Sequence, residues 1–209
     1  MEFACIPSLG SAGRYTVGGW TPFLLVDRGA ALNEHLTTVI VEDSKWAGLL
    51  GFLASREIAA GTKLLDSGLE AAVAAMADEL SNPLAAVAGA LIAVAASNPD
   101  IEKRWDPWLK NIANWFMDLP DGPIVLGRRL LMRARTEGEI AEARKWFVTG
   151  FQRGIPFYSL SIDWLARGLE SIPGDDEDLT RKQRAARHLA GRIDPTHTFT
   201  VIRASEGAM

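Results

Sequence analysis

Residues 82–172 read NPLAAVAGALIAVAASNPDIEKRWDPWLKNIANWFMDLPDGPIVLGRRLLMRARTEGEIAEARKWFVTGFQRGIPFYSLSIDWLARGLESI, and this stretch decides the fold. In it a helix-start signal, an apolar stripe at helical spacing and a stop signal follow one another repeatedly. Asn and Asp side chains cap free amides, and proline in the first helical turn has no amide to leave unpaired. The start signals are Asn82-Pro83, Asp106-Pro107 and Asp121 before Pro123. Because short connections favour antiparallel neighbours, the sequence predicts an array of helical hairpins.

Two further start signals lie in the second half of this stretch. Thr136 and Glu139 form a capping box, and Pro156 opens the next helix. Large aromatic residues recur on the apolar faces of the expected helices, so we expect their rings to form the central core. These residues are Trp108, Trp115, Phe116, Phe147 and Trp164.

The segments on either side of the array have different patterns. Glycines separate β-favouring runs at 14–17, 20–26 and 35–41, which predict a hairpin or a small sheet. The alternating run 196–203 is a further strand that could join them. Ser44 begins a helix, and a second helix is expected at about 62–80. The fold class expected is therefore α+β and mainly α, with a β-rich segment at 1–43, the helical array at 44–172 and a tail at 173–209.

The tail begins with an acidic run. Pro173-Gly174 ends the last long helix of the array, and residues 175–178 are all acidic, so we expect an exposed, hydrated loop. A short basic helix should follow and end at Gly191. Its arginines include Arg181 and Arg184.

Composition limits the function classes. The 209 residues include 48% hydrophobic and 23% charged side chains with a net charge of −4, which describes a folded chain without the basic surface of a nucleic-acid or anionic-membrane binder. The longest apolar run, 84–96, is shorter than the roughly 20 residues of a membrane span. The single cysteine, Cys5, and the lack of a secretory signal pattern predict a cytoplasmic location.

We find no motif for catalysis, a cofactor or a metal. His35, His188 and His197 do not have the spacing of metal ligands. Gly10-Ser-Ala-Gly13 does not have the lysine of a phosphate loop, and residues 175–178 do not have the alternation of a calcium loop. We therefore expect no catalytic residues, no cofactor and no metal.

Trp105 and Trp108, next to Pro107, have two interpretations. At helical spacing, large rings usually fill the gaps between helices. Tryptophan is also enriched at binding hot spots, so the two rings are candidate anchors for a protein partner.

Three segments carry a resemblance to a known family. NPLAAVAGALI at 82–92, NIANWFMDLPDGPIV at 111–125 and FQRGIPFYS at 151–159 resemble the helical region found C-terminal to caspase-like peptidase domains in some bacterial proteins. The resemblance covers roughly residues 47–172 and includes no catalytic His-Cys pair. It implies an accessory module of a caspase-like protease system, with a role in bacterial defence or stress response.

Two functions follow as expectations. The first is a non-enzymatic interaction or regulatory module that binds a caspase-like protease. It could also be a substrate, since the resemblance implies cleavage after basic residues and makes Arg181 and Arg184 candidate sites. The alternative is an enzyme of unrecognised type, whose cleft between sheet and helices is lined by residues such as Asp121, Arg128 and Arg129.

Overall fold

The computed structural model describes residues 2–4, 14–17, 21–27, 37–41, 44–55, 82–96, 99–172 and 176–203, and these are mainly helical. The mainly α prediction is therefore confirmed. The expected helix at 62–80 lies outside the described residues. The helices are α1 (Ser44–Ser55), α3 (Pro83–Ala96), α4 (Pro99–Trp115), α5 (Asp121–Arg133), α6 (Glu137–Arg153), α7 (Ser159–Glu170) and α8 (Glu177–Ala190).

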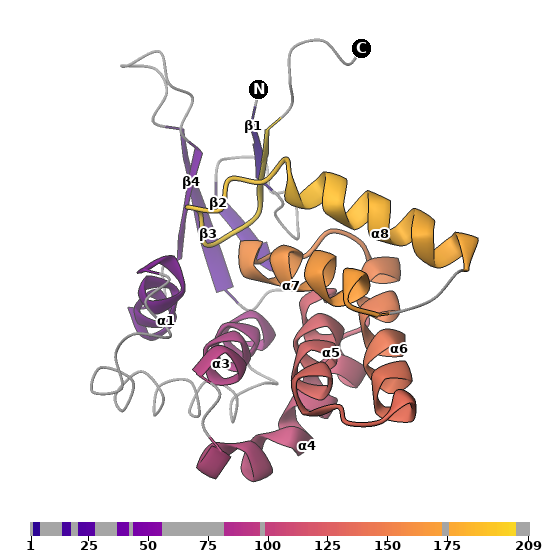
Figure 1. Cartoon of the computed structure of the whole chain (residues 1–209). Helices are drawn as coiled ribbons and strands as arrows, with labels where there is room; N and C mark the ends of the chain where they lie inside the picture. The colour runs from indigo at the N-terminus through magenta and orange to yellow at the C-terminus, as the bar shows by residue number, and fades with distance from the viewer. Residues whose placement is uncertain are drawn as a thin grey trace.

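Helix α3 lies inside the helical array (Figure 1). Every residue from Pro83 to Val94 is buried, as the uniformly apolar sequence of this helix requires. Helices α1, α4 and α5 pack against α3, and α5, α6 and α7 pack against one another. Among the described residues no helix is long and apolar enough to cross a membrane.

The positions of three helix starts agree with the sequence signals. Asn82 accepts a hydrogen bond from the amide of Ala85, and Thr136 and Glu139 form the expected capping box. Helix α5 begins at Asp121, but Asp121 is its first helical residue and does not cap it, because the N-cap is Pro120. The start expected at Asp106-Pro107 is wrong, because α4 begins at Pro99 and contains Pro107. The carboxylate of Asp106 instead binds two arginines of α5, so it joins two helices rather than capping one.

The helix that Pro156 was expected to open begins three residues later, at Ser159. Pro156 itself takes part in a contact with the C-terminal segment: its carbonyl accepts a hydrogen bond of 2.7 Å from the hydroxyl of Thr200. A second bond in the same place joins the amide of Thr200 to the carbonyl of Phe157 at 2.8 Å. The entry to α7 is therefore held by residues more than 40 positions away in the sequence.

Strands occur near both ends of the chain and form two separate pairings. Strands β2 (Arg14–Val17), β3 (Thr21–Asp27) and β4 (Thr37–Val41) form an antiparallel sheet in the order β2-β3-β4. Strand β5 is Val201–Arg203, shorter than the expected 196–203, and it pairs with β1 (Glu2–Ala4) instead of with that sheet. Residues 2–4 and 201–203, far apart in the sequence, therefore lie side by side (Figure 1).

The aromatic core differs from the prediction at one position. Phe147 and Trp164 are buried, and Trp108 and Phe116 are partly buried against the core. Trp115 is 53% exposed, so its expected place in the core is wrong. It is the last residue of α4, and helical spacing specifies a face of the helix but not where the neighbouring helix ends.

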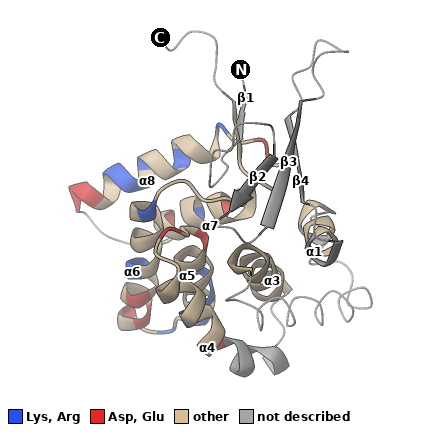
Figure 2. Cartoon of the chain, turned by 180° about the vertical axis from the view of Figure 1, so that it is seen from behind, with Lys and Arg blue, Asp and Glu red and all other residues tan. Residues whose placement is uncertain are grey.

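The acidic segment before α8 is shorter than expected. Residues 173–175 lie outside the described part, Asp176 caps α8, and Glu177 and Asp178 lie in its first turn. Acidic residues are favourable at a helix N-terminus and basic residues at the C-terminus, and α8 follows both rules (Figure 2). The expectation of a four-residue acidic loop is therefore wrong for its second half.

Candidate functional site

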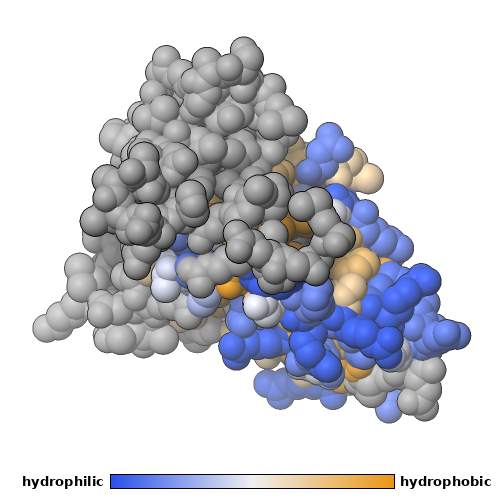
Figure 3. All heavy atoms as spheres, turned by 90° about the horizontal axis from the view of Figure 1, so that it is seen from above, coloured by the Kyte–Doolittle hydropathy of each residue, from blue (hydrophilic) through white to orange (hydrophobic). Residues whose placement is uncertain are grey.

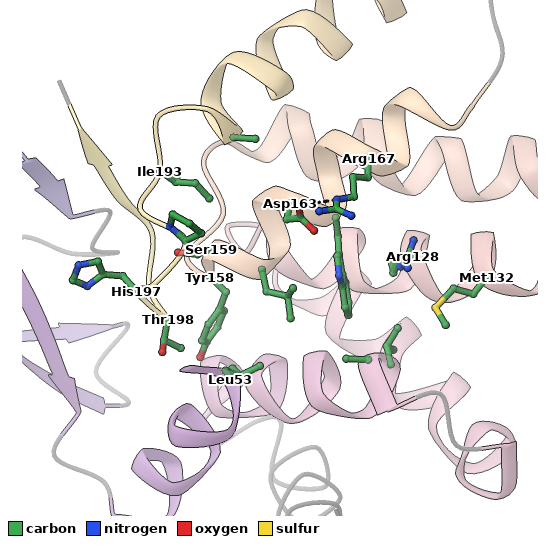
Figure 4. Close-up of a pocket in the computed structure, with 16 residues that line it drawn as sticks. Leu53, Arg128, Met132, Tyr158, Ser159, Asp163, Arg167, Ile193, His197 and Thr198 are labelled. Carbon is green, nitrogen blue, oxygen red and sulfur yellow. Dashed lines mark hydrogen bonds and ion pairs between the residues drawn. The ribbon is translucent and has the colours of Figure 1, made fainter. Parts of the chain in front are cut away.

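A cavity of about 560 Å³ lies among α1, α3, α5, α7 and residues 190–198 (Figure 4). All of these elements contribute apolar lining, which includes Leu53, Val94, Ala95, Met132, Leu160, Trp164 and Ile193. Its polar lining includes Arg128, Ser159, Asp163, Arg167, His197 and Thr198. The cavity thus combines apolar side chains with polar and charged groups, and small-molecule sites likewise combine both kinds of lining.

Arg128, labelled in Figure 4, lies beside Trp164 in this cavity. The guanidinium carbon of Arg128 lies 5.7 Å from the centre of the Trp164 ring, within cation–π range. The Arg128 Nε is buried and has no hydrogen-bond acceptor among the described residues. The cavity therefore contains a positive group that is oriented by an aromatic ring.

The other two basic side chains of the cavity, Arg167 and His197, lie beside carboxylates. Arg167 donates to Asp163 one turn earlier on α7, at 2.8 Å. His197 lies 3.9 Å from Asp194, whose carboxylate also accepts hydrogen bonds from Thr196. Within the described part of the chain, Arg128 is the cavity cation for which no carboxylate partner is found.

Contacts of Tyr158 and Ser159 hold the entry of α7 in place, on the left side of the cavity in Figure 4. The hydroxyl of Tyr158 donates to the carbonyl of Leu84 at 2.7 Å, which joins the entry of α7 to α3. The Tyr158 ring also stacks on Phe199, with 5.2 Å between the ring centres. Ser159 bonds the same C-terminal segment through its amide and hydroxyl. The segment after α8 is thereby held against α7.

Asp121 is fully buried but does not line the cavity. Its two carboxylate oxygens accept hydrogen bonds from the amides of Phe157 and Tyr158, at 2.9 and 3.1 Å. Burial raises the pKa of Asp121 from 3.8 to about 6, although Ser161 and these amides lower it. Asp121 therefore joins the first turn of α5 to the entry of α7.

The three residues that the enzyme hypothesis places in one cleft, Asp121, Arg128 and Arg129, do not line this cavity together. Of the three, only Arg128 lines the cavity, because Asp121 holds the entry of α7 and Arg129 forms an ion pair of 3.1 Å with Asp106. Over the residues that the structure describes, no group of three or more His, Cys, Asp or Glu side chains has the arrangement of a metal site.

A group of exposed apolar side chains lies at the α4–α5 connection and at the α6–α7 connection. We call Trp115, Met117, Arg153 and Ile155 the corner patch. Met117 is 65% and Ile155 41% exposed, so three large apolar side chains face solvent here. Arg153 donates to the carbonyls of Phe116 and Leu119 and contacts the sulfur of Met117. These contacts join the end of α6 to the α4–α5 connection.

Sequence reasoning missed Met117 and Ile155, although a signal was present. Both are large apolar residues in short connections between helices. Residues in such connections usually lie at the surface, so an apolar residue there indicates an exposed apolar side chain. The face in Figure 3, by contrast, is mostly hydrophilic in its described part, with smaller apolar areas.

The residues proposed from sequence for binding and cleavage lie in helices. Trp108 is half-buried in α4, and the side chain of Trp105 in the same helix lies outside the described part. Arg181 and Arg184 are exposed residues of α8. Arg181 is bonded to Asp178 at 2.5 Å, one turn earlier. Neither arginine lies in the segment between α7 and α8.

We expect Trp115→Ala to change the free energy of unfolding by less than about 1 kcal/mol, because truncating an exposed side chain leaves no cavity. The measurement is urea denaturation followed by circular dichroism. A loss of about 3–5 kcal/mol, the usual cost of truncating a buried aromatic, would instead place Trp115 in the core.

Together these features define a mainly helical module with a cavity and an exposed apolar corner. The family model described as Y4kD C-terminal domain matches residues 48–206, and the chain belongs to this family. No curated protein and no solved structure matches the chain.

Proposed function

We propose that this protein is a non-enzymatic interaction module that binds a bacterial caspase-like protease through the corner patch. The observation that carries the proposal is the exposure of Trp115, Met117 and Ile155 beside Arg153. Tryptophan, methionine and arginine are enriched in the centres of protein interfaces, where they supply most of the binding energy.

The rigidity of the corner patch supports the same function. Arg153 is held by two backbone carbonyls, so less side-chain entropy is lost when a partner covers it. Asp118, also exposed, lies near Arg153 and raises its pKa, whereas burial lowers it more. The patch thus presents one aromatic ring and two aliphatic side chains beside charged groups, and we propose a complementary apolar surface on the protease.

The sequence resemblance supports a caspase-like protease as the partner. The family name describes a C-terminal domain, and the resemblance of residues 82–92, 111–125 and 151–159 is to helical regions that follow caspase-like peptidase domains. A module of this kind would act in bacterial defence or stress response by placing or regulating the peptidase. The protein would be cytoplasmic and would need no cofactor.

The test is calorimetric titration of the protein with the purified caspase-like protease encoded in the same genome. We expect binding, and we expect Trp115→Ala and Met117→Ala each to weaken it at least tenfold, as truncation of a hot-spot side chain does. Met132→Ala is the matched control, because Met132 is also exposed but lies on α5, outside the corner patch. Absence of binding would refute the function, and equal affinities for all variants would refute the surface.

Cleavage after Arg181 or Arg184 remains part of this proposal. Peptidases bind extended chains, so a cut at either residue requires part of α8 to unwind first. Because Lys182 is buried and bonded to Asp178, unwinding would also break packed contacts. Incubation with the activated protease and sequencing of new N-termini tests this. An intact chain, or cuts only in α4–α7, would exclude these two sites.

A further inference from the structure

The cavity beside Trp164 has the size and lining of a site for a small organic molecule. Its volume of about 560 Å³ falls within the usual range of roughly 300–1,000 Å³ for such sites. Three helices contribute apolar surface to it through Val94, Ala95, Met132 and Trp164. The part of a ligand that lies in this region should therefore be apolar.

The charge of the cavity indicates the polar part of the ligand. Arg167 is paired with Asp163, so its charge is compensated, and His197 lies beside Asp194. Arg128 has no carboxylate partner among the described residues, and its buried Nε has no acceptor there. An anion bound beside this guanidinium would supply the charge-assisted hydrogen bonds that the arginine lacks among the described residues.

The geometry around Arg128 favours a carboxylate. The Arg128 guanidinium carbon lies over the Trp164 ring, and the N–H groups of a guanidinium donate in its plane. A planar carboxylate matches that edge with two parallel hydrogen bonds. A single uncompensated positive charge also balances a monoanion, whereas a phosphate dianion would leave one negative charge without a partner.

We propose that this cavity binds a small monocarboxylic acid with an apolar body, with Arg128 on the carboxylate and Trp164, Val94 and Ala95 against the body. The ligand would lie between α3 and α7 and so bridge two helices of the array (Figure 4). This function goes beyond binding a protease and does not depend on it.

The test is isothermal titration of the full chain with three probes of the same shape: 3-phenylpropionate, 3-phenylpropanamide and 3-phenylpropylamine. Octanoate is a fourth probe with an aliphatic body. We expect at least one of the two acids to bind with a Kd below about 1 mM, and the amide and amine to bind at least tenfold more weakly, since they cannot accept the two hydrogen bonds. Equal affinity for acid and amide would overturn the role of the carboxylate.

Variants assign the binding to the cavity. Arg128→Met should weaken the acid at least tenfold, and Arg128→Lys should restore only part of the loss, because lysine keeps the charge without the planar fork. Ala95→Phe should block binding by filling the cavity while Arg128 remains. Arg184→Met is the matched control, because Arg184 is an exposed arginine of α8 that does not line the cavity.

Thermal unfolding of each variant shows that it is folded, so that a loss of binding can be read as a loss of the site. If neither acid binds at millimolar concentration, or if Arg128→Met and Arg184→Met bind the acid equally well, the proposal is wrong.

Discussion

Replacing Asp121 by alanine is expected to lower the free energy of unfolding by about 2–6 kcal/mol at pH 5, because each buried amide left without an acceptor costs about 1–3 kcal/mol. The two amides are those of Phe157 and Tyr158, which both donate to the Asp121 carboxyl group. Without this acceptor the entry of α7 loses its connection to α5. Urea denaturation of the two proteins measures the difference.

The effect of Asp121→Ala should depend on pH in a defined direction. Burial raises the pKa of Asp121 to about 6 in the folded protein, so the folded state binds its proton more tightly than the unfolded state does. The stability contributed by this protonated group is fully present below about pH 4 and is lost as pH rises through 6. One pKa unit corresponds to about 1.4 kcal/mol, so the wild type should lose about 3 kcal/mol from this group between pH 4 and 7.

The variant does not have this titration, so the stability difference between wild type and Asp121→Ala should shrink as pH rises from 4 to 7. Asp118→Asn is the control: it changes an exposed carboxylate just before α5 and should stay within about 0.5 kcal/mol of the wild type. A difference that grows with pH would show that the ionised form of Asp121 is the stabilising one.

Phe147→Ala is the second substitution with a large expected effect, a loss of about 3–5 kcal/mol, as for other buried phenylalanines. The Phe147 ring is fully buried in α6 and lies between α5 and α7. Two glycines make room for it: a Cβ on Gly168 would lie 2.3 Å from the ring, and one on Gly127 would lie 3.2 Å from it. Truncation would leave a cavity at the place where three helices meet.

The matched control for Phe147→Ala is Trp115→Ala, a larger truncation at an exposed position. If burial determines the cost, the smaller side chain should cost several times more, as measured by urea denaturation of both variants. Similar losses for the two substitutions would contradict the packing described for Phe147.

The sequence identified part of the cavity but not its composition. It singled out Arg128, and it placed Trp164 on an apolar helix face, but it could not show that the two side chains would lie together. They are 36 positions apart on different helices, and their contact depends on how α5 and α7 cross. For the same reason it grouped Asp121 and Arg129 with Arg128. Asp121 binds the entry of α7 and Arg129 binds Asp106 on α4, and neither of these two residues of α5 lines the cavity beside Arg128.

What the sequence by itself determined was local in origin. The uniformly apolar run at 84–94 required a buried helix, and the capping box at Thr136 located the start of α6, because both signals act within a few residues. Tertiary structure decided what depends on distant residues. The C-terminal segment pairs with β1 and holds the entry of α7, Asp106 binds α5 instead of capping α4, and Trp115 faces solvent where its helix ends. Spacing along one helix specifies which side chains share a face, whereas the partner of that face depends on the packing of the whole chain.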